Sequence, residues 1–398
     1  MLTIDNVYKA RNALKNVARK TDVIYAPKLC PGADLYLKTE NLQVTGSFKV
    51  RGAYYKMSCL SKEEKERGVI ACSAGNHAQG VALAAQKNGL KAVICLPAGA
   101  PISKVEATKS YGAEVCLVEG VYDDAYNKAL QLRDEKGYTF IHPFNDEDVI
   151  SGQATIALEL MEQIPDLDAV IVPIGGGGLI SGIAYTIKTL NPNAKVYGVQ
   201  AAGAPSMKNA VEKGALEGLS SVSTIADGIA VKKPGDITYE MCKKYVDEIV
   251  TVTEDEISAA ILALMERHKL VTEGAGAVAV AAAMFGKVDI AGKKTVCVLS
   301  GGNIDVTILS RVINRGLLMS GRNCQLHIEL TDKPGELQKV TGIIAEWGGN
   351  VVSVRHERSN EGSDINGCYL RIVLETRNFE HIHQIRQALT ENGFKLLD

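Results

Sequence analysis

The sequence predicts an α/β protein built on parallel sheets and followed by a smaller, ferredoxin-like βαββαβ domain. Between Gly68 and about residue 320, short β-branched runs alternate with longer helical patterns, as expected for parallel strands joined by crossover helices. The strand segments are almost continuously hydrophobic, which is typical of strands covered on both faces. After Ser320 the order of the patterns changes to strand, helix, two strands, helix and strand.

The length and charge of the chain restrict its organisation and its partners. With 398 residues it exceeds the roughly 250–300 at which a single hydrophobic core stops growing, so more than one domain is expected. The net charge of −2 and the lack of long Lys and Arg runs argue against a nucleic acid or an anionic membrane as partner. Small molecules are the expected partners.

Targeting signals and cysteine usage indicate the compartment. The N-terminal segment lacks the apolar stretch of a signal peptide, and the apolar segment 275–286 is shorter than the ~20 residues that a bilayer span needs. The nine cysteines are scattered singly, without a C-x-x-C pair that would indicate zinc binding or a redox couple. We therefore expect a cytoplasmic protein with reduced thiols and no metal site.

Eight segments of the α/β region have the pattern of buried strands. Four of them come first and are separated by helices such as NHAQGVALAAQKNG and DDAYNKALQLRDEKG, each of which ends at a glycine. A second group of four occupies the region from residue 169 onward. The predicted strands are 68–73, 91–97, 114–119 and 139–143 in the first group, and 169–175, 195–201, 248–253 and 294–302 in the second.

The C-terminal region reads as strand CQLHIEL, a helix opening at DKPGEL, two strands around the polar turn NEGSDING, a further helix and a final strand in FKLLD. Asp332 is expected to cap the first of these helices, with Pro334 and Gly335 in its loop and first turn. This order is the ferredoxin-like arrangement.

The glycine-rich turn IGGGGLISG (174–182) is the strongest candidate for a ligand site. It follows a predicted strand and precedes a helix, so several backbone N–H groups converge where a phosphate could bind. A nucleotide is excluded because no register fits G-x-G-x-x-G, no G-K-[ST] follows, and the next strand carries Gln200 instead of an acidic ribose ligand. A small phosphorylated cofactor is favoured over a turn that serves tight packing alone.

Two further turns contain groups that could bind a ligand. In SAGNHAQG (73–80), Ser73, Gly75 and Asn76 offer donors for a carboxylate or a ring oxygen, while His77 is expected to serve local packing or hydrogen bonding. In TENLQVTGSFKVRGA (39–53), Lys49 follows a Thr-Gly-Ser turn. It could be an exposed cation or the amine of a Schiff base, and the residues alone leave both possibilities open.

The four segments GSFKVRGA, SAGNHAQG, GGGGLISG and VLSGGN, in this order, resemble the fold-type II pyridoxal-phosphate enzymes, and specifically the threonine dehydratases. The resemblance covers about residues 1–320. It implies a catalytic domain of two parallel-sheet α/β subdomains, the smaller of which spans about 49–146, with pyridoxal 5'-phosphate as cofactor.

The resemblance also implies a role for each motif residue. Lys49 would carry the cofactor and act as catalytic base, with Phe48 beside the ring, Asn76 on its phenolic oxygen and Ser300 at its pyridine nitrogen. Gly175, Gly176, Gly177 and Gly178, with Leu179, would hold the phosphate. The substrate carboxylate would lie against the loop of Ser73, Ala74, Gly75, Asn76 and His77.

The implied reaction is β-elimination and deamination of L-threonine to 2-oxobutanoate and ammonia, and also of L-serine to pyruvate. A serine or hydroxyaspartate dehydratase and a non-catalytic amino-acid-binding regulator remain alternatives, and a threonine synthase is a weaker one. Racemisation is disfavoured because Ala74 stands where racemases of this fold carry a serine. Asp227 is expected in a turn or helix cap. Glu273 is expected to open a helix and complement its dipole as a cap, with a role as a base as the alternative.

Residues 324–398 resemble an ACT domain, most clearly in LTDKPGEL, and the regulatory domain is expected to span 321–398. The resemblance implies that an amino acid such as isoleucine or valine binds between paired ACT domains and controls the enzyme, as in isoleucine biosynthesis. It also implies a homodimer or homotetramer. The alternative is a domain that mediates only dimerisation.

Overall fold

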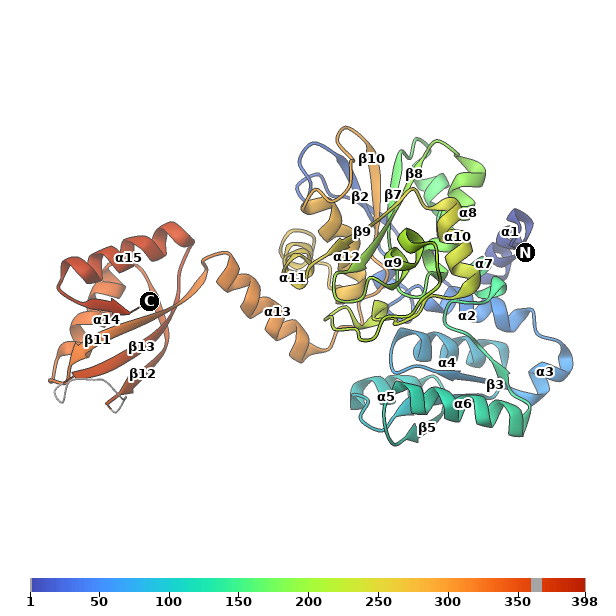
Figure 1. The fold of residues 1–398 in the computed structure, drawn as a ribbon, viewed down its shortest axis with the longest axis horizontal. Coiled ribbons are helices and arrows are strands. Elements are labelled where there is room, and N and C mark those ends of the chain that lie inside the picture. Colours follow the sequence, from blue (N-terminus) through green and yellow to red (C-terminus); the bar gives the residue numbers. More distant parts are fainter. Residues whose placement is uncertain (1, 359–366, 398) are drawn as a thin grey trace. The chain divides into compact units, whose positions relative to one another are not determined.

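A computed structural model describes residues 2–358 and 367–397, which fall into two compact units, Met1–Asp305 and Val306–Asp398 (Figure 1). Most of the predicted turn NEGSDING lies outside the described residues. Among the helices in the described part of the chain, none combines the length and apolar character needed to cross a membrane.

The larger sheet of the first unit has six strands in the order β1-β2-β10-β7-β8-β9. All neighbours are parallel except β1 and β2, which form an antiparallel pair. The sequence predicted four of these strands, whereas the two short N-terminal ones were missed. The strands are β1 (Val23–Tyr25), β2 (Asp34–Lys38), β7 (Ala169–Pro173), β8 (Lys195–Ala201), β9 (Glu248–Val252) and β10 (Lys294–Val298).

Helices cover both faces of this sheet. On one face, Val296 and Val298 join a core formed with α7 (Glu147–Gln163), α8 (Gly178–Leu190) and α10 (Asp236–Tyr245). Cys297 alternates with these valines, and its thiol donates to the Ala279 carbonyl of α12 (Gly274–Met284), which therefore lies on the opposite face.

The smaller sheet has four parallel strands in the order β5-β4-β3-β6. They are β3 (Val69–Cys72), β4 (Ala92–Pro97), β5 (Glu114–Val118) and β6 (Thr139–Phe140), which match the first predicted group. Its helices are α2 (Lys49–Ser58), α3 (Lys62–Arg67), α4 (Asn76–Asn88), α5 (Ile102–Ser110) and α6 (Tyr122–Lys136). Gly89 and Gly137 end α4 and α6 in the left-handed conformation, as predicted.

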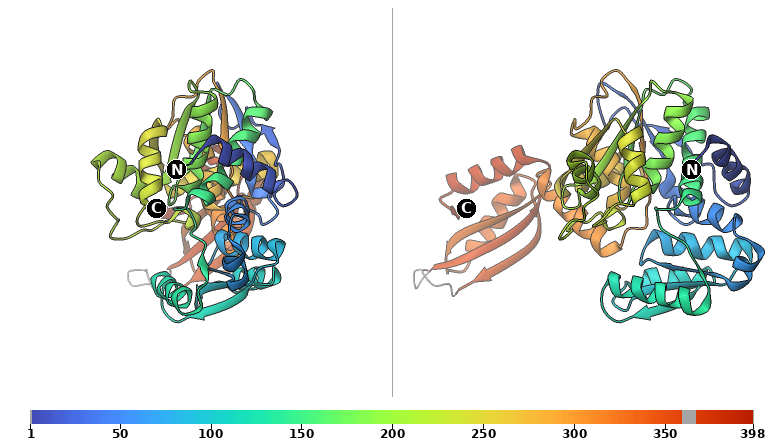
Figure 2. Two further views of the ribbon diagram at one scale, coloured as in Figure 1. Left: turned by 90° about the vertical axis from the view of Figure 1, so that its right-hand side faces the viewer. Right: turned by 45° about the vertical axis from the view of Figure 1, so that its right-hand side comes forward.

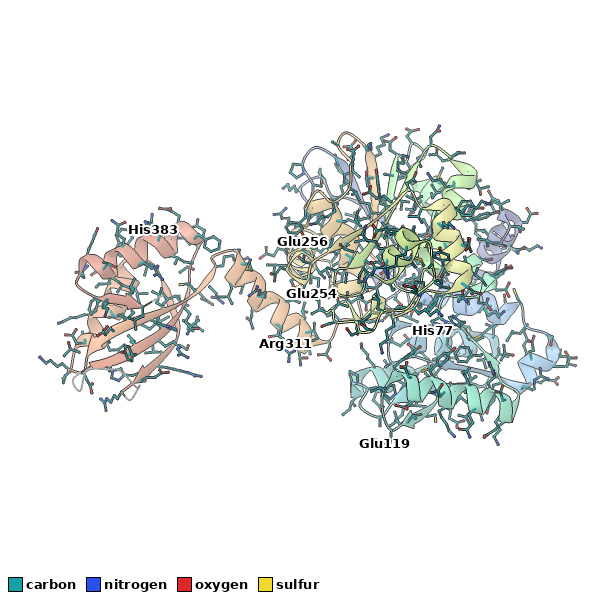
Figure 3. The ribbon with its side chains drawn as sticks, in the orientation of Figure 1. His77, Glu119, Glu254, Glu256, Arg311 and His383 are labelled. Atoms are coloured by element: carbon teal, nitrogen blue, oxygen red, sulfur yellow. The ribbon has the colours of Figure 1, made fainter. Side chains whose placement is uncertain are left out.

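Shorter elements complete the first unit. Glu254 and Glu256, labelled in Figure 3, lie in the first turn of α11, where Glu256 and Thr253 form a capping box. The remaining elements are α1 (Ile4–Leu14), η1 (Glu40–Leu42), α9 (Ser206–Lys213), η2 (Asp227–Ile229), α11 (Glu254–Ala263) and η3 (Leu264–His268).

The second unit begins with α13 (Val306–Met319) and continues with the predicted βαββαβ order. Its antiparallel sheet has the order β12-β13-β11-β14, and α14 and α15 pack on the same face (Figure 2). The elements are β11 (Asn323–Thr331), α14 (Glu336–Glu346), β12 (Asn350–Glu357), β13 (Gly367–Glu375), α15 (Phe379–Glu391) and β14 (Lys395–Leu397).

The expectation that Asp332 caps α14 was wrong. Gly335 is the N-cap residue, with φ of +95°, and no side chain caps the helix. The carboxylate of Asp332 instead forms an ion pair with Arg358, with Nε and Oδ2 3.0 Å apart. The left-handed turn at Gly335 separates Asp332 from the first helical N–H groups.

Candidate active site

A cavity of about 800 Å³ opens at the carboxyl ends of strands from both sheets of the first unit. Every residue that the sequence singled out for the cofactor and the substrate lines it, although the motifs lie far apart in the chain. These residues are Phe48, Lys49, Ser73, Ala74, Gly75, Asn76, His77, Gly175, Gly176, Gly177, Gly178, Leu179 and Ser300.

Lys49 presents its amine to this cavity from the first residue of α2. Its Nζ donates a 2.8 Å hydrogen bond to the Pro143 carbonyl and lies 5.3 Å from the centroid of the Phe48 ring. Burial lowers the pKa of Lys49 to about 8, against an opposing effect of the Glu273 carboxylate. About a tenth of the amine is therefore unprotonated at pH 7, far more than for an ordinary lysine, as nucleophilic or basic chemistry requires.

Two glycines let the helix of Lys49 pack closely against α7. A Cβ on Gly52 would lie 2.6 Å from the Val149 carbonyl oxygen, and a Cβ on Gly152 would lie 2.8 Å from the Arg51 carbonyl carbon. Real Cβ atoms do not approach backbone so closely, so both positions require glycine. The contact fixes α2, and with it the base of the Lys49 side chain.

Arg51 anchors the same helix through a buried ion network. Its guanidinium bonds both carboxylate oxygens of Glu40, at 2.7 and 2.8 Å, and also bonds Glu159 at 2.6 Å. Lys38 contacts the other oxygen of Glu159 at 2.6 Å. Although burial alone would raise the pKa of Glu40, Arg51 holds it below its ordinary value.

The glycine run follows β7 and leads into α8. Gly177 has φ of +99°, and Thr238 Oγ1 donates a 2.6 Å hydrogen bond to the Gly176 carbonyl. A Cβ on Gly176 would overlap the Phe144 ring, and one on Gly178 would lie 2.9 Å from Phe144 backbone atoms. Glycine at these positions therefore lets the chain pass close to Phe144, and the backbone N–H groups at the start of α8 border the cavity, which suits a phosphate.

Asn76 is held in one orientation by two partners across the cavity. Its Nδ2 donates to Glu273 Oε1 at 2.6 Å, and its Oδ1 accepts from Asn303 Nδ2 at 2.8 Å. These bonds fix which end of the amide faces which neighbour.

Glu273 begins a helix, as expected, but its side chain makes no capping hydrogen bond. It is the N-cap residue of α12, and its side chain lines the cavity instead. Burial, followed by the charge of Asp227, raises the pKa of Glu273 to about 7. A glutamate at the start of a helix favoured a cap that complements the helix dipole. Only the fold shows that the Glu273 carboxylate instead accepts a hydrogen bond from Asn76.

The loop between β3 and α4 contains the residues expected at the substrate carboxylate. Gly75 N donates to Ser73 Oγ at 3.1 Å, and the residues that follow begin α4. The His77 side chain is buried and its Nε2 lies 2.8 Å from the Ile141 carbonyl oxygen, which is the local hydrogen bond that the sequence suggested. Burial and Lys49 lower the pKa of His77 to about 3, so its ring is neutral.

Ser300 lies just after the end of β10, and its Oγ donates a 3.2 Å hydrogen bond to the Ala275 carbonyl. Its own carbonyl accepts from Phe48 N at 3.2 Å, which ties the strand end to the segment of Lys49. The hydroxyl is 97% buried yet still borders the cavity, and its lone pairs remain free to accept a bond.

Sequence reasoning missed the segment that faces Lys49. His142 Nδ1 accepts hydrogen bonds from Asn145 N at 2.8 Å and Phe144 N at 3.2 Å, which shapes the loop that carries Pro143. Burial, together with Lys49, lowers the pKa of His142 to about 4. The sequence did offer one signal for this residue, because His142 lies at the carboxyl end of the predicted strand 139–143.

Asp227 lies at the start of the short helix η2, consistent with the expected turn. Its carboxylate accepts from Lys104 Nζ at 2.8 Å at the rim of the cavity. Gln200 is buried elsewhere, where it accepts from Lys208 N and donates to the Ile174 carbonyl.

The residues around the cavity fit pyridoxal 5'-phosphate. The buried amine of Lys49 suits the cofactor's aldehyde, and the hydroxyl of Ser300, just after β10, suits its ring nitrogen. The glycine run, which has no room for side chains, suits its phosphate. The aromatic face of Phe48 borders the same space.

Comparisons with known proteins agree with this assignment. A family model described as pyridoxal-phosphate dependent enzyme matches residues 14–301. The chain is 50% identical to an L-threonine ammonia-lyase of Thermotoga maritima over 398 residues, which cover 100% of this chain and 99% of the relative. It is 46% identical to the catabolic L-threonine dehydratase of Escherichia coli (strain K12) over 78% of this chain and 96% of that protein.

A solved structure gives the same picture. The processed form of threonine deaminase isoform 2 from Solanum lycopersicum superposes with a TM-score of 0.76 and 40% identity, over 79% of this chain and 88% of that one.

Proposed function

This chain belongs to the family of pyridoxal-phosphate dependent enzymes, and we propose that it converts L-threonine into 2-oxobutanoate and ammonia. The observation that carries the proposal is the amine of Lys49 held at one wall of a cavity whose other walls are the glycine nest and Ser300. The name of the T. maritima relative, which matches over the whole chain, supports threonine as substrate.

The chain's own residues would divide the binding of the cofactor among them. The nest Gly175–Gly178 with Leu179 would hold the phosphate, and Phe48 would cover the ring. When bound, the cofactor withdraws electrons from the Cα of an attached amino acid. Ser300 would face the pyridine nitrogen, where a hydroxyl supplies no negative charge to keep that nitrogen protonated.

Lys49 would first attach the cofactor and then, once free, take the proton from Cα. A pKa of about 8 leaves enough unprotonated amine for both tasks. The Pro143 carbonyl, 2.8 Å away, holds Nζ in place when the amine is not bonded covalently. The β-hydroxyl would then take up a proton and leave as water, and hydrolysis of the released enamine would give 2-oxobutanoate and ammonia.

The loop Ser73–His77 would bind the substrate carboxylate with backbone N–H groups at the start of α4. Ala74 in this loop has no group that can exchange a proton. Lys49 therefore works without a second acid–base from that position, which favours elimination over racemisation. Asn76, held by Glu273 and Asn303, would direct its amide toward the phenolic oxygen.

L-Serine is the proposed second substrate, giving pyruvate, because the elimination needs only a β-hydroxyl. The test is the initial rate of 2-oxo acid release from L-threonine, L-serine and threo-3-hydroxyaspartate with cofactor-saturated protein. The expected result is a preference for L-threonine. A preference for L-serine or threo-3-hydroxyaspartate would replace L-threonine as the proposed substrate. The absence of 2-oxo acid from all three compounds would contradict the proposal.

Borohydride reduction tests the assignment of Lys49 directly. Reduction should fix the cofactor on the peptide that contains Lys49, as read by mass spectrometry. Lys49→Ala should give no labelled peptide and lower the rate at least about 100-fold. The matched control Lys62→Ala, at a side chain 86% exposed, should leave both results unchanged.

Residues 321–398 are proposed to form an ACT regulatory domain that binds an amino-acid effector between paired copies in a homodimer or homotetramer. The βαββαβ order and the sheet order β12-β13-β11-β14 support this. Isoleucine or valine should shift the threonine saturation curve of the full chain. An unchanged response after removal of 321–398 would contradict the regulatory role.

A further inference from the structure

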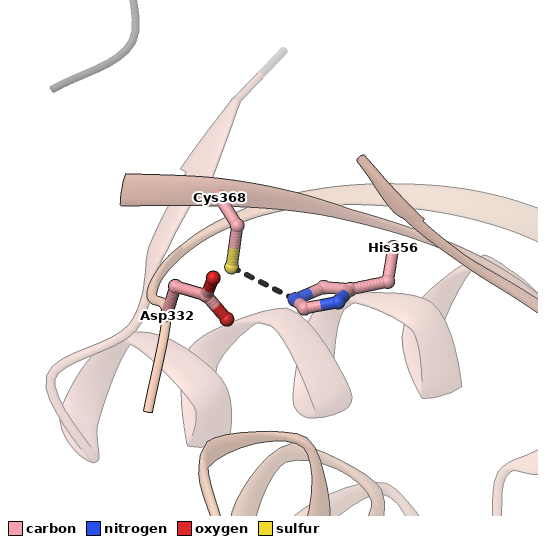
Figure 4. A group of neighbouring side chains, drawn as sticks. All are labelled: Asp332, His356 and Cys368. Atoms are coloured by element: carbon pink, nitrogen blue, oxygen red, sulfur yellow. Dashed lines mark hydrogen bonds between the residues drawn. The ribbon is translucent and has the colours of Figure 1, made fainter. Parts of the chain in front are cut away.

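Three side chains with metal-binding atoms meet in the second unit. Asp332 follows β11, His356 lies near the end of β12, and Cys368 lies at the start of β13. One donor atom from each lies within 4.8 Å of the other two, and His356 Nε2 is 2.9 Å from Cys368 Sγ. Figure 4 shows the carboxylate and the imidazole turned toward the sulfur.

The register of the sheet brings these residues together. Cys368 is paired with Leu330 of β11, two residues before Asp332. His356 is paired with Leu370, two residues after Cys368 and on the same face of β13. The cluster therefore rests on backbone pairing of three chain segments, so its geometry is maintained by the fold.

Burial and charge in the cluster are suited to a cation. Cys368 is 1% exposed and forms the floor, whereas Asp332 and His356 are exposed and leave a path from solvent. Within the described residues, Asp332 forms an ion pair with Arg358, whose side chain is 70% exposed. Arg358 contacts both oxygens of Asp332, with Nε 3.0 Å from Oδ2 and Nη2 3.4 Å from Oδ1, so a bound ion would replace the longer contact at Oδ1.

We propose that Asp332, His356 and Cys368 bind a divalent transition-metal ion of the zinc class, with a fourth position open to solvent. A thiolate, an imidazole and a carboxylate form a mixed donor set that suits Zn²⁺ and excludes Mg²⁺ or Ca²⁺, which prefer oxygen. Donor atoms in a tetrahedral zinc site lie roughly 3.5 Å apart, a value between the 2.9 Å from His356 Nε2 to Cys368 Sγ and the 4.8 Å within which all three donors lie.

Cobalt titration of the full chain, with its cofactor bound and its thiols reduced, tests the site. Tetrahedral Co²⁺ with a thiolate ligand absorbs visible light at longer wavelengths than the cofactor. One Co²⁺ per chain should bind with this absorption, and Zn²⁺ should displace it. Because the ion binds only the folded site, Zn²⁺ should also raise the unfolding temperature.

Variants distinguish the cluster from adventitious thiol binding. Cys368→Ser should abolish the visible band, and His356→Ala should weaken Co²⁺ binding by at least about tenfold. His356 is exposed, so His356→Ala tests the proposal even if Cys368→Ser fails to fold. The control variants Cys324→Ser and Cys59→Ser should retain the band.

The absence of a visible cobalt band in the natural chain would overturn the proposal, and so would a band of equal intensity and affinity in His356→Ala. Loss of the band in the Cys59→Ser control would also overturn it, since the ion would then bind another thiol. Threonine turnover is measured in parallel and is independent of these outcomes, so the proposed catalytic function can fail or hold separately.

Discussion

The Nδ2 atom of Asn76 donates a 2.6 Å hydrogen bond to Oε1 of Glu273, a residue 197 positions away in the chain. This bond joins the first turn of α4 to the start of α12 across the cavity. Asn303 holds the other end of the same amide, so Asn76 cannot rotate without losing both bonds.

Replacing Glu273 should therefore act through Asn76. Glu273→Gln keeps an oxygen acceptor and should bind the cofactor nearly as well as the natural chain. Glu273→Ala removes the acceptor and should weaken cofactor affinity roughly tenfold, because hydrogen bonds to charged groups contribute about 1.5–3 kcal/mol. The measurement is titration of cofactor-free protein, together with the absorption maximum of the bound form.

Glu66→Gln, at an exposed surface position, is the matched control and should change neither value. Equal cofactor affinity and an equal absorption maximum in Glu273→Ala and the natural chain would show that Glu273 does not position Asn76.

The rate at which cofactor-free protein attaches its cofactor should depend on pH through Lys49. Burial lowers the pKa of its amine to about 8, and only the unprotonated form reacts. The rate should rise with pH and level off above that value, with about a tenfold loss for each pH unit below it. Stopped-flow absorption of the bound cofactor measures this profile.

Glu273→Gln should move this profile to lower pH, because the charge of Glu273 raises the pKa of Lys49. An unshifted profile would mean that the two groups do not interact across the cavity.

A methyl group in the glycine nest should expel the phosphate. Gly178→Ala places a Cβ 2.9 Å from Phe144 backbone atoms, which cannot move as freely as a side chain. The start of α8 must shift, and the dissociation constant for the cofactor should rise at least about tenfold. Equilibrium titration with the cofactor checks this.

Gly99→Ala is the control, since no heavy atom lies within 4 Å of its added Cβ. If Gly178→Ala bound the cofactor as tightly as Gly99→Ala does, the phosphate would have to lie elsewhere in the cavity.

The buried network around Arg51 should contribute strongly to stability. Arg51→Met leaves Glu40 without its cation in a fully buried place and should destabilise the first unit by about 3–5 kcal/mol. Urea unfolding followed by circular dichroism measures the change. The exposed pair of Arg133 and Asp134 provides the control, because Arg133→Met should cost less than about 1 kcal/mol.

The sign of the pH effect follows from Glu40. Its folded-state pKa is depressed by Arg51, so the stability it contributes is present above the ordinary carboxyl value and lost as pH falls through the folded-state pKa. Stability of the natural chain should therefore decline in acid more steeply than that of Arg51→Met. If the free energy of unfolding fell equally in acid for both proteins, Arg51 would not be the group that depresses the pKa of Glu40.

Hydrophobic runs and glycine turns predicted most of the fold, because strands buried on both faces leave a strong local pattern. The strand Asp34–Lys38 is short, carries a charged residue at each end and was missed, since its place in the sheet depends on pairing with Lys294–Val298. The cavity residues came from motifs at strand ends. The roles of Glu273 and Phe144 could not be predicted in this way, because they depend on contacts with Asn76 and with the glycine run, which are distant in the chain.

The pairing of β2 with β10 also sets an order of events during synthesis. The smaller sheet lies within residues 69–140 and can form while the rest of the chain is still on the ribosome. Strand β2, made early, must wait for β10 to emerge before its parallel neighbour exists. Ser300 lies two residues after the end of β10, so the nascent chain acquires its complete cofactor-binding cavity only when just over three quarters of it has been translated.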